Sequence, residues 1–213
     1  MADRIIKILT PATEFDFLTL DECKTLLGIA TTTPEEDAQL QMMISVQSAI
    51  IAEYCNRTFA YEEVQETWRS DLTISANRIF LSHWPVKQAD LTIVAAPRGT
   101  VLDPASDYEL EEISGKVEMI TGMSEPIDVT YSGGYKLPDD APLALKQAAI
   151  MLIRQERMMM LQAQTAGIRS ISHRDARVMF FDPNTLLAKT MGKGAQMPQT
   201  VQTLLSQFTR IEA

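Results

Sequence analysis

Two histidines, His83 and His173, are the residues of this sequence best suited to acid–base chemistry. Each stands beside a serine, and the segment 172–175 (SHRD) brings together the residue types of a hydrolase triad. The segment RIFLSHW, which contains Ser82 and His83, has the composition of a strand. Neighbouring strand residues point to opposite faces, so these two side chains are not expected to pair directly. A small hydrolase using His83 or His173 is therefore an alternative to be weighed against a non-enzymatic protein.

The sequence offers no clear ligand set for a metal ion or a cofactor. Glu111-Glu112 should divide between two faces of a strand, and Asp139-Asp140 precede a predicted helix and are expected to cap it. Cys23 and Cys55 lack a second cysteine or a histidine at ligand spacing. We expect both to be small buried side chains in a reducing compartment, a disulfide between them being the alternative. No cofactor, no metal and no catalysis are predicted.

The chain of 213 residues is acidic, with 28 Asp and Glu against 19 Lys and Arg. Residues 1–140 hold 24 Asp and Glu against 10 Lys and Arg, whereas residues 141–213 hold 4 against 9. A protein that grips DNA by its phosphates should be basic, so this balance argues against tight DNA binding. The asymmetry favours an acidic body whose basic C-terminal part meets an acidic partner, for example another copy. The alternative is that both parts are solvated surfaces without a partner. An acidic module that mimics DNA to occupy a nucleic-acid-binding protein is a further functional hypothesis.

Helices are predicted near both ends of the chain. Thr19 with Glu22, and Thr33 with Glu36, have the spacing of capping boxes. Gly28 should end the first helix, and the second should run from Pro34 to about Cys55. A third is predicted with Asp140 as its cap and Pro142 in its first turn, reaching Arg157 and fading before Gly167, and helical spacing returns in residues 198–213. The residues predicted to share the buried face of the second helix are Leu40, Ile44, Gln47, Ile51 and Tyr54.

Between Tyr61 and Tyr135 the pattern changes to short segments rich in β-branched and aromatic residues, separated by turn residues. This predicts an antiparallel module of about six strands. The segments are residues 64–69, 78–84, 91–95, 108–113, 116–120 and 127–135, and residues 176–182 are a further candidate strand. No stretch approaches the ~18 consecutive apolar residues of a membrane-spanning helix.

Three groups of side chains are candidate contact sites for other proteins. The first is a soft, repackable methionine surface, the end of a buried core being its alternative. The second is a basic cluster, for which a protein interface is favoured over nucleic acid. The third is an apolar stripe near the C-terminus, followed by an arginine and predicted to dock on another protein. The methionine surface consists of Met158, Met159 and Met160. The basic cluster consists of Arg169, Arg174 and Arg177. The apolar stripe consists of Val201, Leu204, Leu205 and Phe208, and the arginine that follows it is Arg210.

The order of these elements and the residues at their joints resemble the head–tail connector proteins of tailed bacteriophages, also called adaptor or head-completion proteins, and their relatives in gene transfer agents. The resemblance covers residues 10–157. The part after Gly167 matches less well, and the β insertion is longer than in the compact, mainly helical members. The stretches that carry it are LTPATEFDFLTLDECKTLLGI, EEDAQLQMMISVQSAIIAEYCNRTF, VQETWR, IFLSHWPV and IDVTYSGGYKLPDDAPLALKQAAIMLIRQE.

The resemblance implies a structural subunit of the virion neck, assembled in the host cytoplasm and without enzymatic activity. Copies would form an adaptor ring, a dodecamer being the expected size, below the portal protein. The ring would extend the DNA channel and join the capsid to stopper (head-closure) or tail proteins. DNA would pass without specific binding, because carboxylates lining a channel repel phosphates. No membrane partner is implied, and the free subunit is expected to be a monomer.

The fold class expected from the residues and the resemblance is α+β. A small helical bundle core would be formed by residues 15–60 and 139–166, with an antiparallel β module inserted at 61–135. Residues 167–213 would form a C-terminal arm that docks on the portal or on a neighbouring subunit.

Overall fold

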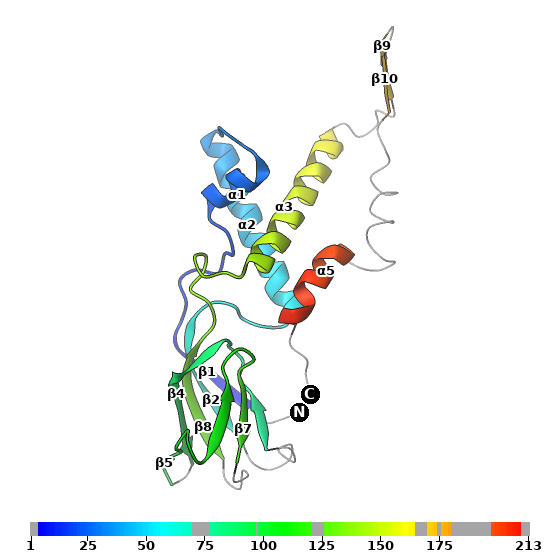
Figure 1. Ribbon diagram of the computed structural model, residues 1–213. Coiled ribbons are helices and arrows are strands. Elements are labelled where there is room, and N and C mark those ends of the chain that lie inside the picture. Colours follow the sequence, from blue (N-terminus) through cyan, green and yellow to red (C-terminus); the bar gives the residue numbers. More distant parts are fainter. Residues whose placement is uncertain are drawn as a thin grey trace. The chain divides into compact units, whose positions relative to one another are not determined.

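The computed structural model of the chain describes residues 4–69, 77–96, 98–120, 126–164, 170–173, 176–179 and 197–209, and it describes only the backbone of 162–164, 170–173 and 176–179. Contacts divide the chain into two units (Figure 1). The β unit comprises Met1–Phe15 and Asn56–Ala141, and the helical unit comprises Asp16–Cys55 and Pro142–Ala213. Each unit is therefore built from two separate stretches of sequence. The predicted division into a helical core, an inserted β module and a C-terminal arm stays a prediction.

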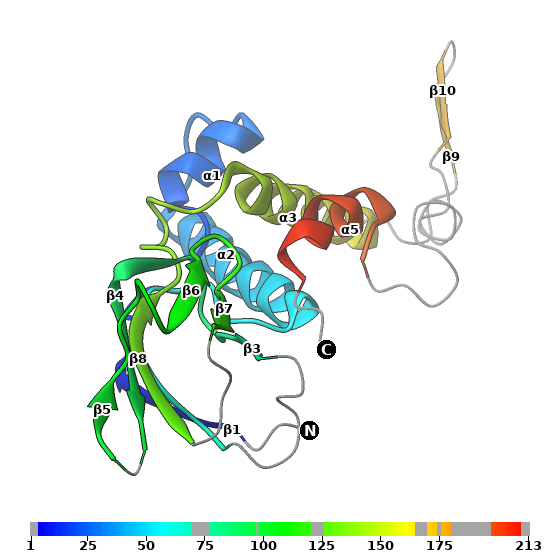
Figure 2. The same ribbon diagram turned by 60° about the horizontal axis from the view of Figure 1, so that its bottom comes forward.

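The β unit contains two antiparallel sheets (Figures 1 and 2). The larger sheet has the strand order β1-β2-β8-β4-β5, and the smaller one has the order β3-β7-β6. The strands of the larger sheet are β1 (Arg4–Thr10), β2 (Glu62–Trp68), β8 (Ile127–Gly133), β4 (Val86–Ala95) and β5 (Thr100–Val101). Those of the smaller sheet are β3 (Arg78–Phe80), β7 (Lys116–Met119) and β6 (Tyr108–Glu111).

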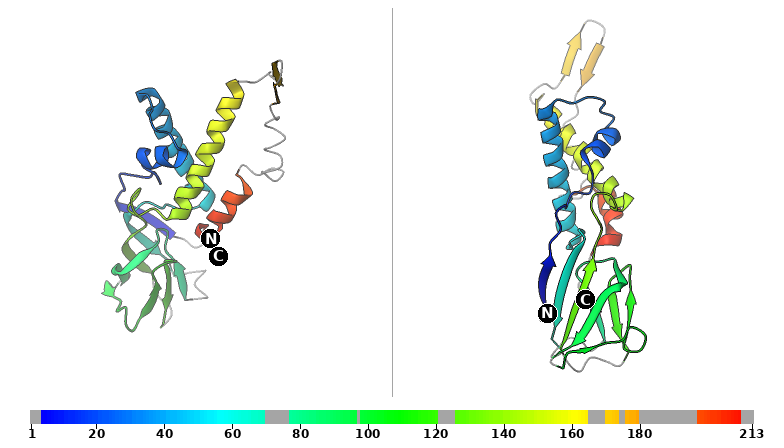
Figure 3. Two further views of the ribbon diagram at one scale, coloured as in Figure 1. Left: turned by 45° about the horizontal axis from the view of Figure 1, so that its top comes forward. Right: turned by 90° about the vertical axis from the view of Figure 1, so that its left-hand side faces the viewer.

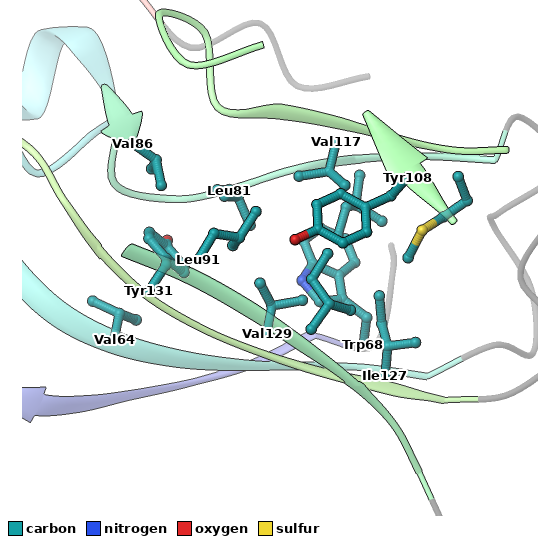
Figure 4. Close-up of a cluster of buried hydrophobic side chains, with 13 residues drawn as sticks. Val64, Trp68, Leu81, Val86, Leu91, Tyr108, Val117, Ile127, Val129 and Tyr131 are labelled. Atoms are coloured by element: carbon teal, nitrogen blue, oxygen red, sulfur yellow. The ribbon is translucent and has the colours of Figure 1, made fainter. Parts of the chain in front are cut away.

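The centre of the larger sheet is the pairing of β2 with β8. The two strands pair without a break from Glu62 opposite Gly133 to Trp68 opposite Ile127, and every second residue of each is buried. This alternation is typical of a sheet that turns one face to a core. Figure 4 shows that side chains of the two sheets meet in one apolar cluster, in which Val117 and Tyr108 lie opposite Val129.

The helical unit contains α1 (Leu20–Leu27), α2 (Pro34–Cys55), α3 (Leu143–Gln164) and α5 (Gln199–Leu205), the last followed by a 3-10 turn, η1 (Ser206–Phe208). It also contains an antiparallel hairpin of β9 (Ser170–His173) and β10 (Ala176–Met179). Helix α3 contacts α1, α2 and α5 (Figure 3). Side-chain hydrogen bonds also join α3 to α1 and to α2. Lys146 Nζ of α3 donates to Glu22 Oε1 of α1 at 2.6 Å, and Gln47 Nε2 of α2 donates to Glu156 Oε2 of α3 at 2.8 Å.

Both predicted capping boxes are confirmed. The Thr19 hydroxyl accepts from the Glu22 amide at 3.1 Å, and the Glu22 carboxylate accepts from the Thr19 amide at 3.0 Å. Thr33 and Glu36 make the same reciprocal pair at the start of α2, with distances of 3.3 and 2.8 Å. Gly28 ends α1 in the left-handed conformation with φ of 71°. Residues close together in sequence therefore fix these helix ends.

The α+β class and the six predicted strand segments are confirmed, and part of residues 176–182 forms β10. Strands β1, β5 and β9 were not predicted. Three details were wrong. Strand β3 ends at Phe80, so Ser82 and His83 lie outside the sheet. Pro142, whose carbonyl accepts from the Lys146 amide at 3.1 Å, precedes α3 directly, so Asp140 does not occupy the cap position. Tyr54 lies on the exposed side of α2, because the buried residues of this helix follow a row that ends at Cys55.

Cys23 and Cys55 are both buried and free, as predicted for small apolar side chains. Burial raises the pKa of the Cys23 thiol, which keeps it protonated and unreactive. Within the part of the chain that the structure describes, no helix combines the length and apolar character needed to cross a membrane.

The apolar cluster of the β unit can be tested with a matched pair of substitutions. Ile93 is fully buried in the cluster, whereas Ile113 of the same unit is 80% exposed. We expect Ile93→Ala to lower the free energy of unfolding by roughly 2–5 kcal/mol, because it removes buried methyl groups and leaves a cavity. Ile113→Ala should change it by less than about 0.5 kcal/mol. Tryptophan fluorescence in urea reports on the β unit, which holds both tryptophans, Trp68 and Trp84. Similar losses in both variants would contradict this placement.

Candidate assembly surfaces and a buried polar cluster

Five polar side chains lie together in the interior of the β unit and are called the polar cluster below: Glu62, Glu66, Ser82, His83 and Tyr131. The Glu residues come from β2 and Tyr131 from β8, while Ser82 and His83 follow β3. The amides of Ser82 and His83 donate to the Tyr131 hydroxyl oxygen at 3.0 and 3.1 Å. The Ser82 amide also donates to Glu66 Oε1 at 2.8 Å. These bonds replace strand pairing, which is why the segment leaves the sheet after β3.

Each carboxylate of the polar cluster has its own donors. Glu66 Oε1 accepts from the Tyr131 hydroxyl at 2.5 Å and from the Ser82 hydroxyl. Glu62 accepts from His83 Nε2 at 2.9 Å and from the backbone amide of Ala12 at 3.0 Å. Buried carboxylates are costly unless they are hydrogen-bonded, and here the donors come from three separate stretches of chain, around Ala12, Ser82 and Tyr131.

Two arginines accompany these carboxylates. The Arg57 guanidinium lies 3.2 Å from the ring centroid of Trp84 and 4.3 Å from that of Phe59, and it donates to the Trp84 carbonyl. Arg4 Nη1 lies 3.9 Å from Glu66 Oε2, and its guanidinium is 5.3 Å from the Trp68 ring centroid. Arg4 therefore places positive charge near Glu66, and the planar groups of both arginines lie against aromatic rings.

The geometry of the polar cluster does not form a nucleophile–base pair. The Ser82 hydroxyl donates to Glu66, whereas His83 Nε2 bonds to Glu62, so the histidine does not activate the adjacent serine. Burial and the nearby Glu66 carboxylate raise the pKa of Tyr131, which keeps the phenol protonated as a donor. All five side chains are buried. We interpret the cluster as a structural network that joins β2, β8 and the segment after β3.

The protonation of His83 gives a testable pH dependence. Burial lowers the pKa of His83 below its ordinary value of 6.5, although Glu62 acts in the opposite direction. The unfolded chain therefore binds the proton more tightly than the folded one, and stability should fall as the pH drops from 6.5 toward the lower folded pKa. The contribution of one such group has a slope of at most about 1.4 kcal/mol per pH unit.

We expect His83→Gln, which keeps a donor for Glu62, to flatten this part of the profile. The measurement is urea unfolding, followed by tryptophan fluorescence, at a series of pH values from neutral to mildly acidic. His173 remains in both proteins and serves as an internal control. Identical pH profiles for the variant and the natural chain would contradict the assignment.

The outward side of α2 is an uncovered apolar surface, called the α2 outer face below. Met42, Val46, Ile50 and Tyr54 recur at four-residue spacing and are 70%, 44%, 40% and 40% exposed. The sequence from 38 to 52 contains no charged residue. A helix whose exposed side faces water normally carries charges there, so an uncharged exposed side is typical of a helix that is covered in an assembly.

A second uncovered apolar surface lies near the C-terminal end of α3 and is called the α3 tip below. It consists of four successive exposed residues: Met158, Met159, Met160 and Leu161. The methionines are therefore a surface, and the alternative that they end a buried core is wrong. Their role in contacting another protein stays a prediction. In Figures 1 and 3 this end of α3 diverges from the start of α2.

Strand β1 is a third apolar surface. It is the terminal strand of the larger sheet, and Ile5, Ile6, Ile8 and Leu9 are each 40–50% exposed. Successive residues of a strand point to opposite faces, so apolar side chains are exposed on both sides of β1. An exposed apolar edge strand is prone to pair with another chain unless it is covered.

Comparison of the sequence and the fold with known proteins identifies the family. A family model described as "Head completion protein" matches residues 16–178. The chain belongs to the head completion protein family. The family resemblance found in the sequence is thereby confirmed, and the match takes in the whole of α1, α2 and α3 and most of the β unit. A search of curated proteins finds no match.

Solved structures share the fold of this head completion protein. A chain from "Virion of native gene transfer agent (GTA) particle" has a TM-score of 0.54 and 16% identity. A chain from "Neck of empty GTA particle computed with C6 symmetry" has a TM-score of 0.52 and 16% sequence identity. A chain from "Neck of native GTA particle computed with C12 symmetry" has a TM-score of 0.50 and 14% sequence identity. Each comparison covers 98% of this chain and 97% of the other. At this identity the similarity establishes a common fold.

The predicted docking stripe lies partly inside this head completion protein. Val201, Leu205 and Phe208 are buried, Leu204 is half-buried, and α5 packs against α3. Docking through the buried side chains would require their removal from the helical unit, so this role stays a prediction. Arg169, Arg174 and Arg210 lie outside the described residues, and only the backbone of Arg177, in β10, is described.

Sequence reasoning missed the α2 outer face and the apolar residues of β1. The absence of charge from 38 to 52 was visible in the sequence and could have indicated the first. The pattern of β1, RIIKILT, interrupts its apolar pairs with Lys7 and does not alternate, so it does not predict which faces of a strand are exposed. The polar cluster was also missed, because its members come from distant segments.

Two adjacent leucines of α5 provide a matched test of how the C-terminal segment is used. Leu205 is fully buried and Leu204 is half-buried. We expect Leu205→Ala to destabilise the helical unit by roughly 2–5 kcal/mol and Leu204→Ala to cost clearly less, because less apolar surface is lost. Far-ultraviolet circular dichroism during urea unfolding follows the helices. Equal, small effects would contradict the packing of α5 on α3.

Proposed function

We propose that this head completion protein is a structural subunit of the neck of a tailed phage or of a gene transfer agent. Copies form a ring between the capsid and the tail, with twelve as the expected number. The observation that carries the proposal is the family match over residues 16–178, joined to a fold shared along 98% of the chain with proteins of gene transfer agent necks and virions. The C6 and C12 symmetry of those particles supports a cyclic arrangement.

The partners in this proposal are the portal protein on one side of the ring and a stopper or tail protein on the other. The exposed apolar surfaces support a role in assembly, because a monomeric protein rarely leaves several such surfaces uncovered. Residues 1–15 and 56–141, the β unit, hold 17 Asp and Glu against 9 Lys and Arg. We propose that carboxylates of this unit line the DNA channel, where they repel phosphates and let DNA pass without binding.

The alternatives are less well supported. A hydrolase using His83 would need a nucleophile beside the imidazole, and the polar cluster pairs His83 with Glu62 instead. The side chain of His173 lies outside the described residues. Nothing specific favours an acidic module that mimics DNA.

The proposal predicts the phenotype of particles produced without this chain. We expect capsids that lack attached tails, because the ring joins the two parts, and normal particles when the gene is supplied in trans. Electron microscopy with an antibody against the chain should place the label at the head–tail junction of the complemented particles. A chain found anywhere else in the particle, or tails attached in its absence, would contradict the proposal.

The histidines provide a control for the enzymatic alternative. The double variant His83→Gln and His173→Gln should restore tail attachment as well as the natural chain, provided that circular dichroism shows an intact fold. A folded double variant that fails to restore it would favour catalysis.

A further inference from the structure

A ring of identical subunits with more than two copies places a specific demand on each chain. Every subunit must present one surface to the neighbour before it and a different, complementary surface to the neighbour after it. A single self-complementary patch produces a closed dimer instead. The helical unit carries two uncovered apolar surfaces on different helices, the α2 outer face and the α3 tip.

The two surfaces belong to separate sides of the helical unit. The opposite side of α2 is the buried one, with Ile44 and Ile51 fully buried, and α2 packs against α1 and α3. The α2 outer face therefore points away from α3 of its own chain. The α3 tip stands at the end of α3 that diverges from the start of α2 (Figures 1 and 3). One chain is thus not expected to bring its two surfaces together.

The charges beside the two surfaces are complementary. Around the α2 outer face, all charged residues of the helix are acidic: Glu35, Glu36 and Asp37 in the first turn and Glu53 near the end. Just before the α3 tip stand the exposed Arg154, which also donates to the Leu26 carbonyl of its own chain, and the half-buried Arg157. Glu156 lies between them and accepts from Gln47, so residues 154–161 carry one net positive charge (two arginines against one glutamate). Apolar side chains framed by acidic residues on one helix and by arginines on the other would attract each other and keep two copies of the same surface apart.

We infer that the α2 outer face of one subunit packs against the α3 tip of the next subunit and that this contact closes the ring. The inference rests on the proposed function. Methionines of the α3 tip suit the contact, because their flexible side chains adapt to a partner's surface, and Tyr54 adds an aromatic residue of the kind enriched in interfaces. The contact is directional, so it is repeated around the ring without pairing like surfaces.

Cysteine cross-linking tests the direction of the contact. Val46 at the centre of the α2 outer face and Met158 of the α3 tip are replaced by cysteine, singly and together, in particles complemented with each variant. The natural Cys23 and Cys55 are buried and are not expected to react. On oxidation, the double variant should give a ladder of multimers on a non-reducing gel. Each single variant should give monomers.

The outcomes of this experiment either support or overturn the inference. Dimers from Val46→Cys alone would show α2 facing α2 and would overturn the directional contact. Monomers from the double variant, in particles whose neck contains the chain, would place the contact elsewhere. The proposed function is tested separately by antibody labelling of the particles. If the antibody labels the neck but the double variant gives no cross-links, only the inference is contradicted.

A charge substitution tests the strength of the same contact. Val46→Arg would bury a positive charge opposite Arg154 and Arg157, and we expect at least about a tenfold loss of the chain from purified particles. Leu143→Arg is the matched control, because Leu143 lies in the same unit, is 82% exposed and stands far along α3 from the tip. Circular dichroism of the free subunits checks that both variants fold. Incorporation of Val46→Arg at the natural level would overturn the inference.

Discussion

The pairing of β2 with β8 is the interaction on which the architecture depends. It joins residues 62–68 to residues 127–133 and forms the centre of the larger of the two sheets. Just outside the pair, the Tyr135 amide donates to the Phe59 carbonyl at 2.7 Å, and Tyr61 donates to the Tyr135 carbonyl at 2.8 Å. The two ends of the inserted module are thereby held side by side. The chain that leaves α2 at Cys55 can return at Leu143, and α2 and α3 can pack as neighbours although 87 residues separate these positions.

The polar cluster follows from the same pairing. In β2 the alternation that buries Val64 and Trp68 also buries Glu62 and Glu66, because residues two apart share a face. Two buried carboxylates would destabilise the core if they lacked donors. Tyr131 on the paired strand and the Ser82 amide donate to Glu66, and the His83 amide donates to the Tyr131 hydroxyl. The segment that leaves the sheet after β3 therefore helps to stabilise the buried carboxylate. A network of this kind specifies a unique arrangement of the strands, since a shifted register would leave the carboxylates without partners.

The outer surface of the chain differs from that of a protein that works alone. Its apolar residues are concentrated in β1, the α2 outer face and the α3 tip, on segments that are otherwise well packed. The stability of each unit resides in its own core, so these surfaces are available for contacts with other chains. The chain belongs to the head completion protein family, and in the proposed neck ring these surfaces would contact the neighbouring chains.

Local sequence determined both ends of α1, the start of α2 and six of the strand segments, and it carried the family resemblance. The capping boxes at Thr19 and Thr33 and the glycine at position 28 act between residues a few positions apart, and such signals can be read without the fold. Tertiary structure alone decided that β1 pairs with β2 and that Tyr54 lies on the exposed side of α2. It also decided how Glu62, Glu66 and His83 come together. These features depend on contacts between residues far apart in sequence. A strand or a helix has the same local hydrogen-bonding pattern whether a given face is covered or not, and only packing against distant segments decides which faces are buried.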